Sequence, residues 1–529
     1  MTCLDATAQV KLDRFFPPAV EVGSESQVKA EGKFPKWPVI IDVDRDDVEV
    51  KANEGSGSLT VRASEDAAPG VVWVRIRDAA SASSLVPLLI ERSVITEEVE
   101  PNNKLSESTE IDLPCVAVGR LSKSGDLDSF SFEVSEGQTL VISVVAHRLL
   151  KSPMDAVAQL VDEKANVLQQ VDDRRGLDPQ IVYRADRDAR LTLRLFAFPE
   201  TPNSTIGYAG SASFVYMVRI TTDAFVDHVL PLVAAGKEEK THIGGWNLDA
   251  KNAVKYSPAT SISPRAAYVP GALGWQWLAE TKTASDQFFD DQVDQVPHAN
   301  RFPCQFSGRI RTRGEIDRYH LSLKKGTRYR IGVDSRRFGF LLDSVLRLVN
   351  PEDGNELARN DDASRNQFDA ALEYSAKEDA TIELQVSDLV DGFGMRHAYS
   401  VIVEEVKPSF SLTVAADHFE VVAGASVDVP VSVSRRGGFN SSITVDAESL
   451  PEGVTCEPAE SEAKGGTAKT VTLKLKATES ASAWQGAFRV TGRAIDKEGK
   501  ASAESTKATY ALREVIAVSE FWLTVAEKK

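Results

Sequence analysis

Apolar and polar residues alternate along most of this chain, which predicts β-strands rather than helices. The clearest examples are SLTVRA at 58–63, VDVPVSVS at 427–434 and TVTLKLKA at 470–477. A strand places successive side chains on opposite faces of a sheet, so each segment offers one apolar face to a core. Gly, Pro, Asn and Asp punctuate these segments as turns. The pattern predicts an all-β fold made of tandem β-sandwiches.

One long segment of the chain occurs twice. LPCVAVGRLSKSGDLDSFSF around Cys115 matches FPCQFSGRIRTRGEIDRYHL around Cys304. Six identical residues keep one constant spacing: Cys115, Gly119, Arg120, Gly125, Asp128 and Gly137 correspond to Cys304, Gly308, Arg309, Gly314, Asp317 and Gly326. The unit is much longer than a solenoid repeat. We therefore expect two copies of one sandwich, with both cysteines at the same buried position.

A shorter match precedes each large copy. The segment 13–17, followed by Gly23 and Gly32, resembles the segment 227–231, followed by Gly236 and Gly245. It predicts a smaller related module before each large copy, although Pro and Gly recur in turns of any protein.

These patterns divide the 529 residues into five domains, in keeping with about 100–200 residues per domain. The predicted order is an immunoglobulin-like sandwich at 9–93, the first large copy at 94–222, a small immunoglobulin-like module at 223–293, the second large copy at 294–407 and a C-terminal immunoglobulin-like sandwich at 408–529.

The formal charge is −17, from 78 acidic and 61 basic residues. An acidic chain of this kind disfavours nucleic acid as a partner, because phosphates require a basic patch. The charge is compatible with binding hard cations through carboxylates, and solubility is the simpler explanation. No run of about 18 apolar residues occurs, so we expect no membrane-spanning segment.

The cysteines and the first residues bear on location. Cys3, Cys115, Cys304 and Cys456 fit neither the spacing of a zinc site nor a compact disulfide framework. Cys115 and Cys304 hold the same place in the two copies and are expected to be small core residues. Ala6-Thr7-Ala8 has the small-residue pattern of a signal-peptidase site, with no charged and apolar leader before it. We expect an exported protein that is extracellular, at the cell surface or periplasmic.

Two motifs of the first large copy resemble a known family. EVEPNN at 98–103 and GDLDSF at 125–130 are similar to motifs of the bacterial pre-peptidase C-terminal domain family, and the arrangement resembles that of large secreted planctomycete-type proteins. The resemblance covers 94–222 well and 294–407 less well. It implies a jelly-roll β-sandwich that accompanies secreted enzymes, and some members, such as those of bacterial collagenases, bind calcium and substrate.

The same segment is the best candidate for a metal site, namely calcium. Calcium takes 6–8 oxygen ligands, and Glu98, Glu100, Asn102 and Asn103 place four oxygen-bearing side chains close together. Asp126 and Asp128 would add two carboxylates if the GDLD turn lies beside them, as the resemblance implies. The alternative is that these residues only cap turns and strand ends. In the second copy, DQVPHAN at 294–300 lacks two of the oxygen ligands, so calcium is less expected there.

Two other residue sets have both a functional and a structural interpretation. A second acidic set is repeated and is therefore expected to hold turns: Asp155, Asp172, Asp173 and Asp178 in one copy, and Asp343, Asp361, Asp362 and Asp369 in the other. Trp246, Trp275 and Trp277 could stack on sugars, but a small domain also needs large core side chains. We favour the core for all three.

No catalytic motif occurs in the chain. It has no G-x-S-x-G, H-E-x-x-H, P-loop or G-x-G-x-x-G segment, and its seven histidines are scattered. Two functions remain. The first is a non-catalytic, exported, elongated scaffold that binds a protein or an extracellular polysaccharide. The second is an accessory part of a secreted protease or other hydrolase whose catalytic domain lies elsewhere.

Overall fold

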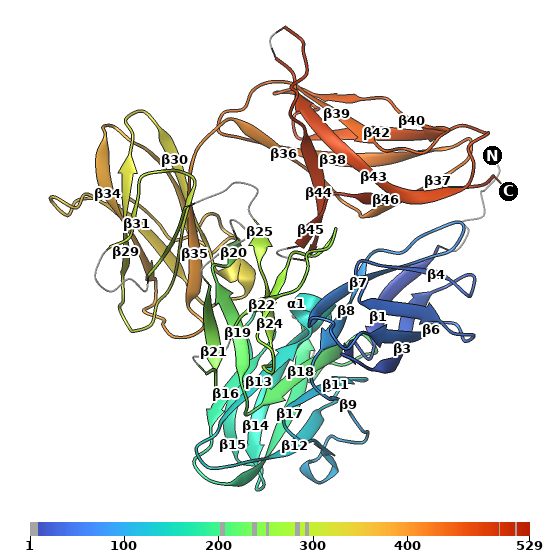
Figure 1. The fold of residues 1–529 in the computed structure, drawn as a ribbon, viewed down its shortest axis with the longest axis vertical. Helices are drawn as coiled ribbons and strands as arrows, with labels where there is room; N and C mark the ends of the chain where they lie inside the picture. The colour runs from blue at the N-terminus through green and yellow to red at the C-terminus, as the bar shows by residue number, and fades with distance from the viewer. Residues whose placement is uncertain are drawn as a thin grey trace.

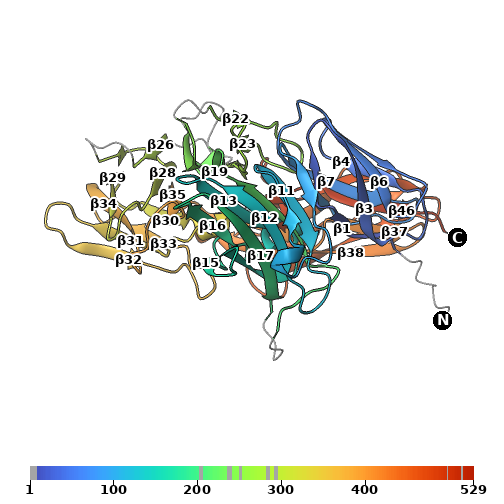
Figure 2. The same ribbon diagram turned by 90° about the horizontal axis from the view of Figure 1, so that it is seen from below.

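The structure is a computed structural model, and it describes residues 9–201, 207–234, 241–249, 253–280, 286–290, 296–496, 498–513 and 516–528. In these ranges the chain is almost entirely β, arranged as several sandwiches around a central junction (Figure 1; Figure 2). Helical turns are confined there to Leu105–Glu107 (η1), His147–Leu150 (α1) and Arg336–Phe338 (η2). None of these is long and apolar enough to cross a membrane. The predicted all-β class of tandem sandwiches is confirmed. Cys3 and the 6–8 motif lie outside the described residues.

The N-terminal sandwich packs two four-stranded sheets against each other, with strand orders β1-β3-β6-β5 and β2-β8-β7-β4. Its strands are β1 (Lys11–Phe16), β2 (Ala19–Glu21), β3 (Glu25–Lys33), β4 (Ile40–Val43), β5 (Val48–Ala52), β6 (Ser58–Ala63), β7 (Gly70–Arg77) and β8 (Val86–Glu91). Leu59 and Val61, which alternate with polar neighbours in SLTVRA, are fully buried in the core. The alternation thus forms strand β6 because each second side chain leaves water.

The two large copies have the same topology, which confirms the predicted duplication. The first has sheets β10-β12-β17-β14-β15 and β16-β13-β18-β11-β9; the second has β27-β29-β34-β31-β32 and β33-β30-β35-β28-β26. The strands of the first are β9 (Ile95–Glu97), β10 (Thr109–Glu110), β11 (Cys115–Arg120), β12 (Asp128–Val134), β13 (Thr139–Val145), β14 (Met154–Asp162), β15 (Val167–Val171), β16 (Gln180–Arg184), β17 (Ala189–Pro199) and β18 (Val215–Thr221). Those of the second are β26 (Asp286–Phe289), β27 (His298–Ala299), β28 (Cys304–Arg309), β29 (Asp317–Leu323), β30 (Arg328–Asp334), β31 (Ser344–Val349), β32 (Glu356–Asn360), β33 (Ala371–Ser375), β34 (Ala380–Asp388) and β35 (Ala398–Glu405).

Cys115 and Cys304 open equivalent strands and lie in the two equivalent cores. Both are free and buried, as predicted. One boundary differs from the prediction. Strand β26 pairs with β28, in the same parallel arrangement in which β9 pairs with β11. The second sandwich therefore includes Asp286–Phe289, upstream of the predicted start at residue 294.

The segment between the large copies is not an immunoglobulin-like sandwich, so that prediction is wrong for its described residues. It forms three small sheets of two, two and three strands: β19 (Phe225–Leu230) with β21 (His242–Trp246), β20 (Val233–Ala234) with β25 (Ala279–Glu280), and β22 (Lys255–Tyr256), β23 (Ala266–Tyr268) and β24 (Trp275–Trp277). One part of the shorter sequence match, between 13–17 and 227–231, corresponds to a shared structural feature. The strand pairs β1 with β3 and β19 with β21 both shift register at the matched aspartate, Asp13 or Asp227.

The C-terminal sandwich is built from eleven connected strands. They are β36 (Ser409–Val414), β37 (His418–Val422), β38 (Ser426–Arg436), β39 (Ile443–Glu448), β40 (Val454–Cys456), β41 (Ala459–Ser461), β42 (Thr470–Ala477), β43 (Trp484–Ala494), β44 (Thr506–Arg513), β45 (Ile516–Val518) and β46 (Phe521–Ala526). Strict alternation in β38 and β42 buries one face of each strand, including Val429, Val431, Leu473 and Leu475. The exposed positions that alternate with them carry polar side chains, except for Pro430.

One apolar cluster joins the separate domains. Trp73 of the N-terminal sandwich, Met217 of the first large copy, Trp275 and Trp277 of the central segment and Leu512 of the C-terminal sandwich all belong to it. Trp275 and Trp277 are 6% and 7% exposed, and Trp246 packs against the same cluster. These tryptophans are therefore core residues of the junction rather than a surface platform.

The first and last sandwiches also contact each other directly, so the domains do not form the elongated string that the sequence suggested (Figure 1). Arg75 and Asp417 make a buried ion pair of 2.9 Å, and Asp417 also accepts the Leu85 backbone N–H. Gln485 of β43 bonds both the Arg77 guanidinium and the Asp78 carbonyl. The chain thus returns to its own first domain.

Candidate metal site and its counterpart in the second copy

Four of the predicted ligands converge at one end of the first large sandwich. Glu98 follows β9, Asp128 begins β12, and Asp126 lies in the turn just before it. Carboxylate oxygens of Glu100, Asp126 and Asp128 lie within 4.8 Å of one another. The parallel pairing of β9 with β11 brings Glu98 to the same place, where it accepts the Arg120 backbone N–H at 2.8 Å. The sequence segments EVEPNN and GDLDSF therefore do meet.

A tyrosine that the sequence analysis did not single out ties two of these carboxylates together. The Tyr216 hydroxyl of β18 contacts Glu98 Oε2 at 2.9 Å and Asp128 Oδ2 at 2.5 Å. Gly119 lies directly beside these groups, and a Cβ there would collide with both the Tyr216 hydroxyl and Glu98. Tyr399 and Gly308 repeat the arrangement in the second copy. Recurrence of this tyrosine in both last strands is the signal that could have identified it.

Several oxygens of the cluster have no hydrogen-bond donor among the described residues. They are Asp126 Oδ1, Asp128 Oδ1 and Asn102 Oδ1, each on a fully buried side chain. Asn102 is tied to the cluster through its backbone N–H, which donates to Glu100 at 3.1 Å. Asn103 is half-buried, and no described hydrogen bond joins it to the others. Buried oxygens without donors are costly, and carboxylate and amide oxygens are the ligands that calcium takes.

The charges of this cluster are not compensated by the protein. Within the described ranges, no lysine or arginine forms an ion pair with any of the four carboxylates, and the Arg120 guanidinium turns away to Glu31. Burial, followed by the hydrogen bond and charge of Glu98, raises the pKa of Asp128 to about 10. Burial also raises the pKa of Glu98. Without a cation, the cluster therefore holds at least one proton near neutral pH.

The second copy places a cation of its own in the equivalent cluster. Arg311 stands where the first copy has Ser122, and its guanidinium forms two hydrogen bonds to Asp290, at 2.8 and 3.0 Å. It also lies 3.7 Å from Glu315. Glu315 occupies the place of Asp126, since each carboxylate accepts the backbone N–H four residues before it. The arginine thus brings a positive charge to the matched carboxylates.

The carboxylate that corresponds to Glu98 is Asp290, which the sequence alignment missed. Asp290 follows β26 as Glu98 follows β9, and it accepts the Arg309 backbone N–H at 2.8 Å. The predicted counterpart began at Asp294, which lies outside the described residues. Burial raises the pKa of Asp317 to about 7, with Arg311 among the groups that oppose the rise. Its equivalent Asp128, which lacks a neighbouring arginine, reaches about 10.

Replacing Arg311 by the residue of the first copy should destabilise the second sandwich. Arg311→Ser leaves Asp290, Glu315 and Asp317 without their cation. Because Arg311 is 40% exposed, the expected loss in unfolding free energy is modest, on the order of 1 kcal/mol. Urea denaturation measures it, with Arg301→Ser, an arginine 84% exposed, as the control. Equal stability of the two variants would show that Arg311 does not compensate these carboxylates.

Two members of the second repeated acidic set, Asp178 and Asp369, hold turns as predicted. Asp178 accepts the backbone N–H groups of residues 146–148 at the start of α1. Asp369 does the same for residues 335–337 at η2. Burial raises the pKa of the Cys115 and Cys304 thiols, so neither is a ready nucleophile.

Comparison with known proteins finds similarities of low score among solved structures. The pre-peptidase C-terminal domain of a collagenase from Bacillus anthracis is 19% identical, with a TM-score of 0.18, over 23% of this chain and all of that domain. Fibronectin(III)-like modules of Clostridium thermocellum CbhA are 10% identical, with a TM-score of 0.14, over 45% of this chain and 93% of theirs. Domains 1–6 of the surface layer protein SbsC are 10% identical, with a TM-score of 0.16, over 99% of this chain and 55% of theirs. No family model and no curated protein matches the chain.

Proposed function

We propose that this chain is a non-catalytic, exported scaffold protein whose first large sandwich binds one calcium ion. The observation that carries the calcium site is the contrast between the two copies. The same topology places matched carboxylates together in both copies. Among the described residues, an arginine pairs with these carboxylates only in the second copy. The first leaves its buried carboxylate and amide oxygens for an external cation.

The ligand set favours calcium over a transition metal. Glu98, Glu100, Asn102, Asp126 and Asp128 offer only oxygen, which suits a hard cation, and neither histidine nor cysteine belongs to the cluster. Bound calcium would supply the charge that Arg311 supplies in the second copy. It would also fix the 98–103 segment, which leads from the first domain into the first large sandwich.

A scaffold role is supported by how the domains are connected. They share an apolar junction and a buried ion pair, so their relative positions are held by side-chain contacts as well as by the chain. The proposed partner is a protein or a polysaccharide outside the cell. The twofold occurrence of one sandwich, with different charge compensation in each copy, fits a structural module better than a catalytic one.

Calcium should raise the thermal stability of the protein. A ligand that binds only the native state stabilises it by about 2.7 kcal/mol when the free ligand concentration is a hundred times Kd. If the Kd is on the order of 10⁻⁴ M, about 10 mM calcium reaches this concentration. Asp128→Asn and Glu100→Gln should abolish the shift in melting temperature. Asp317→Asn, the matched change in the second copy, should leave it intact.

Isothermal titration calorimetry supplies the stoichiometry, which we expect to be one calcium per chain. Magnesium at the same concentration should bind more weakly, because it demands near-ideal octahedral geometry and gives up its waters reluctantly. A melting temperature indifferent to both calcium and chelator, together with no calorimetric heat, would contradict the proposed site.

A further inference from the structure

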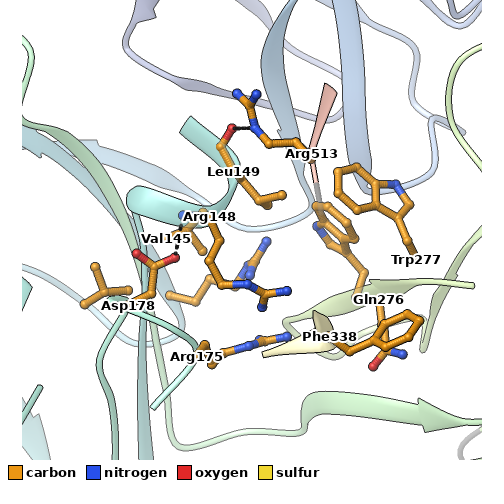
Figure 3. A pocket seen from close by; sticks show the side chains of 12 residues that line it. Val145, Arg148, Leu149, Arg175, Asp178, Gln276, Trp277, Phe338 and Arg513 are labelled. Carbon is orange, nitrogen blue, oxygen red and sulfur yellow. Dashed lines mark hydrogen bonds between the residues drawn. The ribbon is translucent and has the colours of Figure 1, made fainter. Parts of the chain in front are cut away.

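A small cavity lies at the junction of the domains, away from the proposed calcium site. Its volume is about 70 Å³, well above the roughly 15 Å³ that one water requires. The wall comes from four parts of the chain: the first large copy, the central strand β24, the turn η2 of the second copy and the end of β44. Figure 3 shows Arg148 and Arg175 extending into the same space, with Trp277 and Phe338 along its other side.

The charge of this cavity is strongly positive, although the chain as a whole is acidic. Arg148, Arg175, Arg219 and Arg513 line it, against the single carboxylate of Asp178. Both carboxylate oxygens of Asp178 accept hydrogen bonds from backbone N–H groups at the start of α1. The lining therefore gathers guanidinium groups without a carboxylate available between them.

Three of the four arginines have partners of their own. Arg219 forms a bidentate pair with Glu91, at 2.5 and 3.2 Å. Arg513 donates to the Leu149 carbonyl at 2.8 Å and stacks over Trp73. Arg148 also has an interaction partner of its own.

Arg175 differs from these three. Its guanidinium forms no ion pair or hydrogen bond with any residue that the structure describes. The carboxylate that attracts it electrostatically is Asp227, which already accepts hydrogen bonds from Arg396, His228 and Gln180. Burial and the charges of Arg396, Arg148 and Arg219 lower the pKa of Arg175 to about 9. A partly buried cation among like charges is unfavourable unless an anion joins it.

We infer that this cavity binds a small oxyanion, sulfate or phosphate, through the Arg175 guanidinium. A guanidinium presents a planar fork of donors that matches two oxygens of such an ion. The volume admits one ion of this size. Because four parts of the chain line the cavity, a bound oxyanion would link them at the junction and stabilise their arrangement.

Calorimetry and thermal unfolding in sulfate, phosphate and chloride at equal ionic strength test this inference. The wild-type protein should bind one sulfate or phosphate, and its melting temperature should rise more than in chloride. Arg175→Gln should weaken binding at least tenfold. Arg187→Gln, which removes the same charge from an arginine 63% exposed on the same sandwich, should bind like the wild type.

Stability without the anion separates a binding role from a structural one. If Arg175 serves an anion, Arg175→Gln should be at least as stable as the wild type in chloride, because a repelled charge has been removed. A large loss of stability in chloride would show instead that Arg175 supports the fold. A sulfated monosaccharide that binds as tightly as inorganic sulfate would identify a glycan as the source, whereas its failure to bind would identify a free ion. Equal responses of wild type and Arg175→Gln to sulfate would overturn the inference.

Discussion

Asp417→Ala is expected to lower the free energy of unfolding by about 3–5 kcal/mol and to separate the first sandwich from the last. Asp417 is 1% exposed and accepts hydrogen bonds from Arg75 and from the Leu85 backbone. Removing it leaves the Arg75 guanidinium, itself 6% exposed, buried without a counter-charge. Other contacts at this interface include the Gln485 hydrogen bonds, the stacking of Arg75 and Arg77 on Trp522, and the hydrogen bonds that Glu420 accepts from Gln9 and from the Ala82 backbone N–H.

Urea denaturation gives the energy, and small-angle scattering gives the separation as an increase in the radius of gyration. Asp428→Ala, at an aspartate 60% exposed on the same sandwich, is the control and should change neither quantity. A variant at Asp417 that is as compact and as stable as this control would contradict the role of the ion pair.

The same variant should reveal a defined acid dependence. Burial favours a raised pKa for Asp417, but the hydrogen bond from His418 and the charge of Arg75 outweigh it and lower the pKa to about 2. The pKa of an aspartate in the unfolded chain is about 3.9. The stabilisation by the charged form is thus complete above about pH 4 and is lost as the pH falls through about 2. The stability difference between wild type and variant should shrink over this window.

Glu91→Ala is the second large effect that we expect, again about 3–5 kcal/mol in the free energy of unfolding. Glu91 ends β8 of the first sandwich, and its carboxylate pairs with Arg219 of β18, with both side chains 3% exposed or less. The Trp275 indole N–H also reaches Glu91, at 3.3 Å. One substitution therefore leaves a buried guanidinium unpaired where three parts of the chain meet.

Tryptophan fluorescence during urea denaturation should detect this change, because the Trp275 indole contacts the Glu91 side chain that is removed. Glu133→Ala removes a carboxylate that is 70% exposed and 3.6 Å from Arg190, so it should cost no more than about 1 kcal/mol. If Glu91→Ala costs no more than this control, the pair with Arg219 is not a support of the junction.

The strands and the duplication could be predicted from the sequence because they depend on local periodicity and on a repeat. Burial of Leu473 and Leu475 follows from alternation in one strand, and the shared topology follows from the match of Cys115 with Cys304. The residues of the proposed calcium site could be singled out because EVEPNN and GDLDSF are short segments dense in oxygen-bearing side chains. Each of these features is recognised either within one short segment or by comparing two matching segments.

The features that sequence reasoning missed join residues far apart in the chain. Arg75 and Asp417 come from the two ends of the molecule, and nothing near either residue indicates the other. Arg311 was visible as a departure from Ser122, but its partner Asp290 was hidden because the following segment differs between the copies. The central segment buries its tryptophans against neighbouring domains, so its composition resembles that of a sandwich that it does not form.

The return of the last sandwich to the first has a mechanical consequence. Gln9, at the start of the described chain, bonds Glu420 of β37, which pairs with the final strand β46. A pull applied to residues 9 and 528 would pass through the sheets that contain β1 and β46 and would load this interface before the domains in between. The domains in between would carry the full tension only after the contacts between the first and last sandwiches, including the Arg75–Asp417 ion pair, had broken.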